Sequence, residues 1–182
     1  MAPIWVIVGA PGAGKTTVGR MLAERLGVDF RDTDEDIEVV SGRSIPDIFL
    51  EDGEQGFRDV EAMAVRRAIA EHDGVLSLGG GAVLRDETRA ALADVPVVWL
   101  QVTAGQAAAR VGLNTPRPVL VGNVRGQLVS LLAARTPLYD EVADLRVETD
   151  GRSPEQIVEL ILAGTPEVGR ATEPEGRGGS NE

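Results

Sequence analysis

The stretch GAPGAGKT at residues 9–16 constrains the possible folds of this chain more than any other part of the sequence. It matches the pattern G-x-x-x-x-G-K-[ST] in full, between a short apolar run at 4–8 and a helical pattern at 15–26. Glycines let the backbone amides of such a loop turn inward into an anion-binding nest, and the helix start adds its positive dipole end. The sequence therefore predicts a strand, a phosphate-binding loop and a helix here.

Lys15, inside this stretch, is the only lysine of the chain, and every other position with a long basic side chain holds arginine. A compact, flexible ammonium group suits the bridging of β- and γ-phosphates, whereas the planar fork of arginine suits bidentate pairing. The alternative, an ordinary glycine-rich turn with a surface lysine, does not account for the flanking strand and helix. Thr16 offers a hydroxyl to Mg²⁺. We expect the nucleotide to be bound by Gly12, Ala13, Gly14, Lys15, Thr16 and Thr17.

Composition excludes several classes of function. The net charge is −11, so a nucleic acid, which needs a basic patch for its phosphate backbone, is not an expected partner. The chain has no cysteine, which excludes disulfides, thiol catalysis and cysteine-based metal sites. No apolar run reaches the roughly 18 residues that span a bilayer, and the N-terminal apolar run lacks a preceding basic segment. We therefore expect a cytoplasmic protein with no membrane partner. A monomer is the expected state, although composition does not determine it.

Short apolar runs alternate with helical patterns up to residue 163. We expect strands at 4–8, 28–34, 74–81, 95–102 and 144–149, and helices at 15–26, 34–42, 44–53, 54–72, 86–94, 104–112, 124–135 and 153–164. This alternation predicts one α/β domain at 1–163, with a three-layer α/β/α architecture around a five-stranded parallel sheet. Residues 164–182 are rich in Gly, Pro and Glu and cannot bury enough apolar surface to become ordered, so we expect a disordered acidic tail.

Four residues have predicted local roles in this architecture. Ser153 and Gln156 have the spacing of a capping box at the start of the last helix. Asp86 is expected to cap the helix that begins beside it. His72, the only histidine, stands at the end of a long predicted helix, and we interpret it as a solvated residue without a catalytic part.

Two absences narrow the class of phosphate-loop protein. The usual GTPase needs an Asn-Lys-x-Asp motif to recognise guanine, and a chain whose only lysine is Lys15 does not contain it. The predicted strands containing VVWLQ and VLSLGG both lack the acidic pair that follows an aliphatic run in motor ATPases. The chain is also barely larger than a minimal domain of this kind. These observations favour a small-molecule kinase.

The segment DTD at 32–34 is the first candidate for the acceptor side of the reaction. On an extended segment, Asp32 and Asp34 would point to the same face because they are two residues apart. One could hold Mg²⁺ through water, and the other could orient a hydroxyl group or accept its proton. A helical pattern follows directly, so a pair of helix N-caps is an equal alternative.

Two further candidate sites are an arginine beside a phenylalanine and a cluster of three glycines. Arg58 follows Phe57 and has Glu61 one helical turn further on, which fits an anion site braced by a carboxylate; an ordinary surface ion pair is the alternative. The three glycines at 79–81 follow a predicted strand and would let a ligand approach backbone amides. The alternative is a strand-end turn, but three glycines exceed what a turn needs.

Two arginines accompany prolines in the second half of the chain. Arg117 lies in the loop TPRPVL, where a mobile arginine could close over the phosphates and neutralise charge in the transition state. Arg135 stands in RTPLY, at the expected end of the helix 124–135. We therefore expect a lid at about 112–124, with Arg117 inside it.

Together these motifs resemble those of shikimate kinases, over about residues 4–163 and in the family's order: GAPGAGKT, DTD, FR, GGG, an RP lid and R-x-P-L-Y. The first two motifs occur in many small kinases, whereas the full set in this order is far more specific. The resemblance implies a P-loop kinase fold, with ATP and Mg²⁺ required. It also implies phosphorylation of the 3-hydroxyl of shikimate to shikimate 3-phosphate, a step of chorismate and aromatic amino acid biosynthesis.

The resemblance further implies a role for each motif residue. The catalytic groups would be Lys15, Asp34 and Arg117. The acceptor would be bound by Asp34, Phe49, Phe57, Arg58, Gly79, Gly80, Gly81 and Arg135, with the two arginines on the shikimate carboxylate. Mg²⁺ would be held by Thr16 and Asp32, the latter through water. The adenine would be flanked by Arg110, Arg152 and Pro154.

Other functions remain as alternatives. A kinase for another small polyol acid, such as gluconate, shares the phosphate loop but would be expected to lack the arginine pair and the glycine cluster. A catalytically silent nucleotide-binding domain would be expected to have lost Lys15, Thr16, Asp32 or Asp34, and all four are present. A tail at 164–182 that recruits a protein partner is a further alternative to a solvating one.

Overall fold

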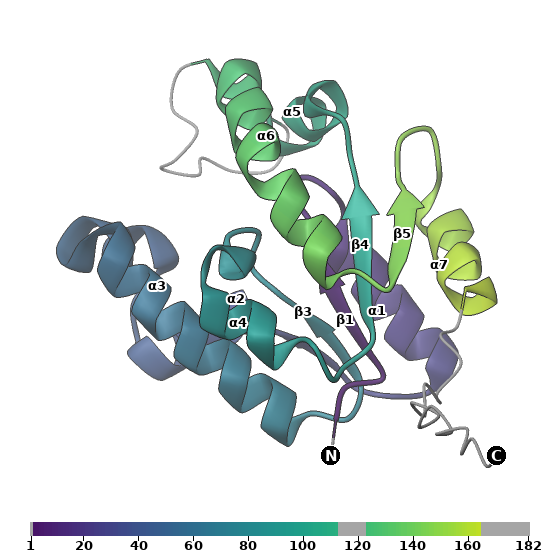
Figure 1. Ribbon diagram of the computed structural model, residues 1–182, viewed down its shortest axis with the longest axis horizontal. Helices are drawn as coiled ribbons and strands as arrows, with labels where there is room; N and C mark the ends of the chain where they lie inside the picture. The colour runs from purple at the N-terminus through teal and green to yellow at the C-terminus, as the bar shows by residue number, and fades with distance from the viewer. Residues whose placement is uncertain (1, 113–122, 165–182) are drawn as a thin grey trace, which may run out of the picture.

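Five parallel strands form the centre of the protein in the computed structural model, which describes residues 2–112 and 123–164 (Figure 1). Their order across the sheet is β2-β3-β1-β4-β5, and each neighbouring pair runs parallel. The strands are β1 (Trp5–Val8), β2 (Phe30–Asp32), β3 (Val75–Ser77), β4 (Val97–Gln101) and β5 (Leu145–Glu148). The predicted five-stranded parallel sheet is therefore confirmed, with strands shorter than expected.

The helices connect successive strands. They are α1 (Lys15–Leu26), α2 (Thr33–Ser41), α3 (Ile45–Glu71), α4 (Asp86–Ala91), α5 (Ala104–Gly112), α6 (Val124–Val142) and α7 (Pro154–Ala163), with a 3₁₀ turn η1 (Ala82–Leu84) after β3. Trp5 and Ile7 of β1 pack with α1 and α7, whereas Val6 and Val8 pack with α3 and α6. Successive side chains of a strand point to opposite faces, so this division places helices on both sides of the sheet and confirms the three-layer architecture.

The helix α3 differs from the predicted pair of helices at 44–53 and 54–72. It runs from Ile45 to Glu71 with a single break at Gly53, whose φ of 72° and ψ of −179° are not helical. Glycine adopts such positive φ values without the steric cost that other residues meet. The predicted boundary is therefore real, but it is a kink inside one element.

The helix α6 extends further than its sequence pattern predicts. The expected end at residue 135 is wrong, because the helix continues through Pro137 to Val142. Proline inside a helix removes one backbone hydrogen bond and is usually disfavoured. Here the turn after Pro137 carries Tyr139, which is fully buried, and Leu138, which packs against the same core cluster. Tertiary packing thus outweighs the local cost, and Arg135 lies within the helix.

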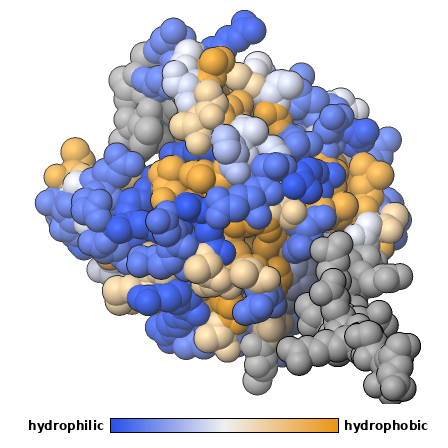
Figure 2. Space-filling view, viewed as in Figure 1, coloured by the Kyte–Doolittle hydropathy of each residue, from blue (hydrophilic) through white to orange (hydrophobic). Residues whose placement is uncertain are grey.

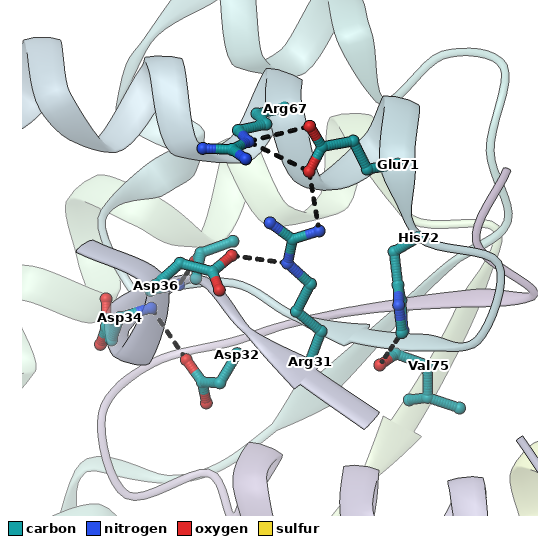
Figure 3. A network of polar contacts seen from close by, with 10 residues as sticks. Arg31, Asp32, Asp34, Asp36, Arg67, Glu71, His72 and Val75 are labelled. Carbon is teal, nitrogen blue, oxygen red and sulfur yellow. Dashed lines mark hydrogen bonds and ion pairs between the residues drawn. The ribbon is translucent and has the colours of Figure 1, made fainter. Parts of the chain in front are cut away.

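Two local predictions fail and one holds. Asp86 is the first residue of α4, and Arg85 takes the cap position without a side-chain cap bond. His72 is buried: the chain extends there (φ −103°, ψ 139°), and the ring Nε2 lies 3.1 Å from the carbonyl oxygen of Val75 (Figure 3). The capping box of α7 is confirmed by both of its hydrogen bonds.

Polar side chains cover much of the face seen in Figure 2, where apolar residues form several separate areas. This distribution suits a chain with a net charge of −11. Within the described ranges, no helix combines the length and the apolar character that crossing a membrane requires.

The capping box makes a prediction for stability. Ser153 Oγ accepts from the Gln156 amide at 3.3 Å, and Gln156 Oε1 accepts from the Ser153 amide at 2.9 Å. Ser153→Ala removes the first bond, and we expect it to lower the free energy of unfolding by about 1 kcal/mol in urea titrations. Ser153→Asp keeps an acceptor and serves as the control. Equal stability of the alanine and aspartate variants would contradict the prediction.

Candidate active site

The phosphate-binding loop follows the carboxyl end of β1, the strand that lies between β3 and β4 in the sheet. Gly12 and Gly14 adopt positive φ values of 81° and 91°, and Gly14 is the N-cap of α1. A Cβ on Gly12 would lie 2.8 Å from the backbone oxygen of Ala107, so this glycine also permits close packing against α5. Ala13 is buried, and Thr17 stands exposed in the first turn of α1. The loop therefore has the positive-φ glycines between β1 and α1 that its sequence predicts.

Lys15 is placed at the centre of this loop. Its Nζ donates to the backbone oxygens of Gly9 at 2.9 Å and Ala10 at 3.3 Å. The ammonium group thus lies over the loop and beside the start of α1, where the helix dipole is positive. An anion in this position would meet both the side-chain charge and the backbone amides.

Thr16 and Asp32 bring two oxygen donors together next to the loop. The Thr16 hydroxyl donates to Asp32 Oδ2 at 3.1 Å, although the two residues are 16 positions apart in the chain. Asp32 ends β2 and is 8% exposed, so its carboxylate is fixed at the edge of the sheet. Hydroxyl and carboxylate oxygens are ligands that Mg²⁺ prefers, so this pair fits a magnesium site.

Asp34 does not share the face of a strand with Asp32, as the sequence had suggested. The chain enters α2 at Thr33, and Asp32 is its N-cap, with Oδ1 accepting from the Asp34 amide at 3.0 Å (Figure 3). The N-cap alternative is therefore confirmed for Asp32. The helical turn directs the Asp34 side chain to the glycine cluster: its Oδ1 lies 2.6 Å from where a Cβ on Gly79 would be.

An ion-pair network holds the first turn of α2 in place (Figure 3). Arg31 of β2 donates through Nε to Asp36 Oδ2 at 2.7 Å and through Nη1 to Glu71 Oε2 at 3.4 Å. Arg67 binds the same Glu71 carboxylate at 2.9 and 3.0 Å. The network links β2, α2 and the end of α3, and so it restrains the turn that carries Asp34.

Arg58 forms a buried ion pair and not the surface pair that was the alternative. Its Nη1 donates to Glu61 Oε2 at 2.6 Å, and the Glu61 side chain is only 2% exposed. Burial raises the pKa of Glu61, Arg58 opposes this effect, Asp34 adds to it and Arg135 opposes it more weakly. These influences show that α2, α3 and α6 bring four ionisable groups together.

The glycine cluster at 79–81 packs against this charged group. A Cβ on Gly79 would lie 2.7 Å from Glu61 Oε1, and a Cβ on Gly81 would overlap the guanidinium of Arg58. A Cβ on Gly80 would lie 3.0 Å from Cδ of Pro11, in the phosphate loop. The glycines are thus required for close packing between the acceptor-side charges and the phosphate loop, which a simple turn would not explain.

Phe49 and Phe57 stack with their ring centroids 4.4 Å apart. Phe57 belongs to a small apolar cluster between α2 and α3 and is 4% exposed, while Phe49 is half-buried at its edge. The Arg58 guanidinium carbon lies 5.2 Å from the Phe57 ring centroid. The two rings therefore form an apolar wall beside Arg58.

Arg110 links the phosphate loop to the turn between β5 and α7. Its Nη1 donates to the Gly12 oxygen at 3.1 Å and to Thr149 Oγ1 at 3.3 Å. Arg152 follows in the same turn, its Nη1 donating to the Glu148 oxygen at 2.8 Å, and Pro154 is the first residue of α7. The three residues expected to flank adenine thus meet at the turn between β5 and α7, and Arg110 also contacts the phosphate loop.

Of the remaining predicted site residues, the structure describes some and not others. Arg135 lies on α6 and, with Leu84 of η1, lines an open hollow of about 750 Å³. Arg117, most of the expected lid at 112–124 and the tail from residue 165 lie outside the described residues. Their predicted roles stay predictions.

Two residues at the site were not singled out from the sequence. The Thr33 hydroxyl accepts from the Gly79 amide at 3.3 Å, and the Tyr139 hydroxyl donates to the Gly80 oxygen at 2.5 Å. Both stand inside recognised motifs, DTD and RTPLY, and a motif residue without an assigned role was the available signal. Their hydroxyls fix the glycine cluster from two different elements.

The raised pKa of Glu61 makes a pH prediction. A carboxyl whose pKa is higher in the folded than in the unfolded protein binds protons more readily when folded, so its ionisation removes stability as pH rises above the unfolded value of 4.5. Glu61→Gln removes the ionisable carboxyl group and with it this loss of stability. Denaturant titrations at pH values above 4.5 should show the variant gaining stability relative to the parent protein as pH rises. The opposite slope would mean that Arg58 dominates over burial.

Known proteins resemble this chain over most of its length. The model of the shikimate kinase family matches residues 11–165. A shikimate kinase from Saccharopolyspora erythraea is 57% identical over 163 residues, which cover 89% of this chain and 93% of that protein. The solved shikimate kinase from Acinetobacter baumannii, in complex with shikimate, has a TM-score of 0.85 at 38% identity, covering 89% of this chain and 91% of that one.

A gluconokinase from Sinorhizobium meliloti also matches, with a TM-score of 0.55 and 20% identity over 88% of this chain and 90% of that one. At this identity the likeness concerns the fold alone. The family model, in contrast, covers most of the chain together with both halves of the site. The chain belongs to the shikimate kinase family.

Proposed function

We propose that this protein transfers the γ-phosphoryl group of ATP to the 3-hydroxyl of shikimate. The observation that carries the proposal is the packing of the glycine cluster, which joins the Arg58–Glu61 pair and Asp34 on one side to the phosphate loop on the other. Membership of the family and the shikimate-bound relative from Acinetobacter baumannii support the choice of acceptor.

Shikimate is a rigid ring with one carboxylate and several hydroxyl groups, so its site needs cations at one end and an acceptor of hydroxyl protons at the other. We assign the carboxylate to Arg58 and Arg135, and the hydroxyl groups to Asp34. The Phe49–Phe57 wall would pack against the ring. Charge-assisted hydrogen bonds of this kind each contribute about 1.5–3 kcal/mol. Gly79, Gly80 and Gly81 would line the acceptor site through their backbone.

The nucleotide would lie in the phosphate loop, cradled by residues 12–17 with the adenine near Arg110, Arg152 and Pro154. Thr16 and Asp32 fit a Mg²⁺ ion, with Asp32 acting through water. Mg²⁺, when bound, would neutralise charge on the phosphate oxygens.

In the reaction itself, the protein's work is positioning and charge stabilisation. Asp34 would orient the 3-hydroxyl and accept its proton as the oxygen bonds to phosphorus. The bond from phosphorus to the β-phosphate oxygen would break on the opposite side. Lys15 would follow the transferring group with its ammonium, and Arg117 would add a second cation from a lid at about 112–124. A closed lid would exclude water and suppress hydrolysis of ATP.

The proposal also covers the domain organisation of the chain, its location in the cell and its partners. Residues 1–163 would form the catalytic domain and 164–182 an acidic, disordered tail. The protein would act as a cytoplasmic monomer, with no nucleic-acid or membrane partner. A kinase for gluconate and a catalytically silent nucleotide-binding domain are the two competing functions.

A coupled assay of ADP release separates these functions. ATP and Mg²⁺ are supplied with shikimate, with gluconate and with no acceptor. Turnover with shikimate alone supports the proposal. Turnover with gluconate, or ADP release that needs no acceptor, would remove the assignment of the acceptor site and leave the phosphate loop standing. Nucleotide binding without any turnover would favour the silent domain.

Arg58→Ala tests the acceptor assignment. We expect the KM for shikimate to rise about 30-fold, corresponding to about 2 kcal/mol of lost binding, with little change in the KM for ATP. Arg66→Ala is the matched control, because Arg66 is an exposed arginine on the same helix and lies outside the network that restrains the turn of Asp34. The steady-state assay measures both constants. Parallel effects of the two substitutions would rule out a specific role for Arg58.

Lys15→Ala tests the nucleotide side. Loss of a preorganised cation at the transferring group should lower kcat by about 100-fold or more, because the interaction strengthens as charge develops in the transition state. Lys15→Arg keeps the charge but changes its shape and length, and it should recover only part of the loss. If the arginine variant were fully active, charge alone would matter at this position.

A further inference from the structure

Tyr139 is the only tyrosine of the chain, and its hydroxyl group is buried at the centre of the acceptor side. The residue is fully buried, and its hydroxyl donates to the backbone oxygen of Gly80 at 2.5 Å. Tyr139 lies four residues after Arg135 on α6, so the two side chains share one face of the helix. The hydroxyl therefore lies between the glycine cluster and Arg135, the residue proposed to bind the substrate carboxylate.

The direction of the hydrogen bond from this hydroxyl is fixed. Burial raises the pKa of Tyr139 to about 12 against the opposing effect of Arg135, so the group keeps its proton at neutral pH. Its single proton goes to the Gly80 oxygen. The Arg135 guanidinium has only donors, so the phenolic oxygen can only accept from it.

Gly80 carries this restraint on to the phosphate loop. A Cβ at Gly80 would lie 3.0 Å from Pro11 Cδ and 3.3 Å from the Gly9 oxygen, so its backbone already packs against the loop. A carbonyl held from one side by Tyr139 and a Cα pressed on the other side against the loop leave Gly80 little freedom. The position of Arg135 is thus tied to the position of the phosphate loop.

We propose that Tyr139 is a positioning residue for the acceptor: its hydroxyl holds Arg135 and Gly80 in a fixed relation, so that the substrate carboxylate and the attacking hydroxyl keep their place relative to the phosphate loop. The proposal rests on the proposed function, because it needs an anionic acceptor bound by Arg135. It assigns a role to the hydroxyl that packing does not require.

The ring and the hydroxyl of Tyr139 can be separated experimentally. The ring packs in the core between the sheet and α6 and lies 5.8 Å from the Trp99 ring, with a tilt of 31°. Tyr139→Phe retains these apolar contacts and removes only the oxygen. Thr88→Val is the matched control, since Thr88 lies on α4 and its buried hydroxyl has no hydrogen-bond partner among the described residues.

The first measurement is steady-state kinetics of the full chain with ATP, Mg²⁺ and shikimate. We expect Tyr139→Phe to raise the KM for shikimate about tenfold, as loss of one buried hydrogen bond predicts, and to change the KM for ATP less than about twofold. Thr88→Val should leave both constants unchanged. Equal changes in both KM values, or no change in either, would overturn the proposal.

A second measurement decides the matter even if Tyr139→Phe fails to fold. Biosynthetic incorporation of 3-fluorotyrosine labels the protein at Tyr139 alone, so its ¹⁹F NMR spectrum has one resonance. Shikimate should shift this resonance along the same saturation curve that calorimetry gives for binding, and an equal concentration of acetate should not. A resonance that does not respond to saturating shikimate would overturn the positioning role.

Assays of the unsubstituted protein distinguish a failure of the role of Tyr139 from a failure of the proposed function. If it turns over shikimate and neither measurement responds as expected, only the role of Tyr139 falls. If the unsubstituted, unlabelled protein neither turns over nor binds shikimate, the proposed function falls, and the role of Tyr139 falls with it.

Discussion

The burial of β1 between β3 and β4 is the constraint on which the site depends. All four residues of β1 are buried, and parallel neighbours pair with it on both sides. The chain reaches β3 and β4 through separate helical connections, and open α/β sheets bind their ligands at the carboxyl ends of such strands. The phosphate loop begins at this edge, and the strand before it cannot shift without disturbing both halves of the sheet.

Charge in the acceptor half is balanced at short range. Arg58 and Arg135 bring positive charge into a chain that is strongly acidic, and both of them and Asp34 act on the pKa of Glu61. A buried carboxylate beside an arginine gains attraction but loses hydration, and the second effect is the larger one for Glu61. This arrangement leaves Arg58 with a fixed orientation and a buried Nε that has no partner among the described residues.

The fold could be predicted from sequence because its main signals are local. A buried run followed by the glycine loop, and the regular alternation of strands and helices, determine a parallel sheet with helices on both faces. Two of the failures share one physical cause, which is tertiary packing. Pro137 does not end α6 because Tyr139 is buried beyond it, and His72 is not solvated because its ring lies against the carbonyl group of Val75 in β3.

The site could be predicted in part. The motifs named Arg58, Asp34 and the glycines, but the burial of the Arg58–Glu61 pair depends on contacts between α3 and the glycine cluster that no local pattern contains. The turn of Asp34 into α2 was one of two alternatives that the sequence left open. The Tyr139–Gly80 bond joins residues 59 positions apart, and spacing alone does not reveal such a contact.

The single lysine has a consequence for chemical labelling. Because Lys15 carries the only side-chain amine of the sequence and lies over the phosphate loop, an acylating nucleotide analogue has one lysine target, and that target is inside the nucleotide site. Arginines supply the other long cationic side chains and do not react with acylating groups under the same conditions. Acylation of Lys15 in the unsubstituted protein would therefore report whether the nucleotide site is occupied.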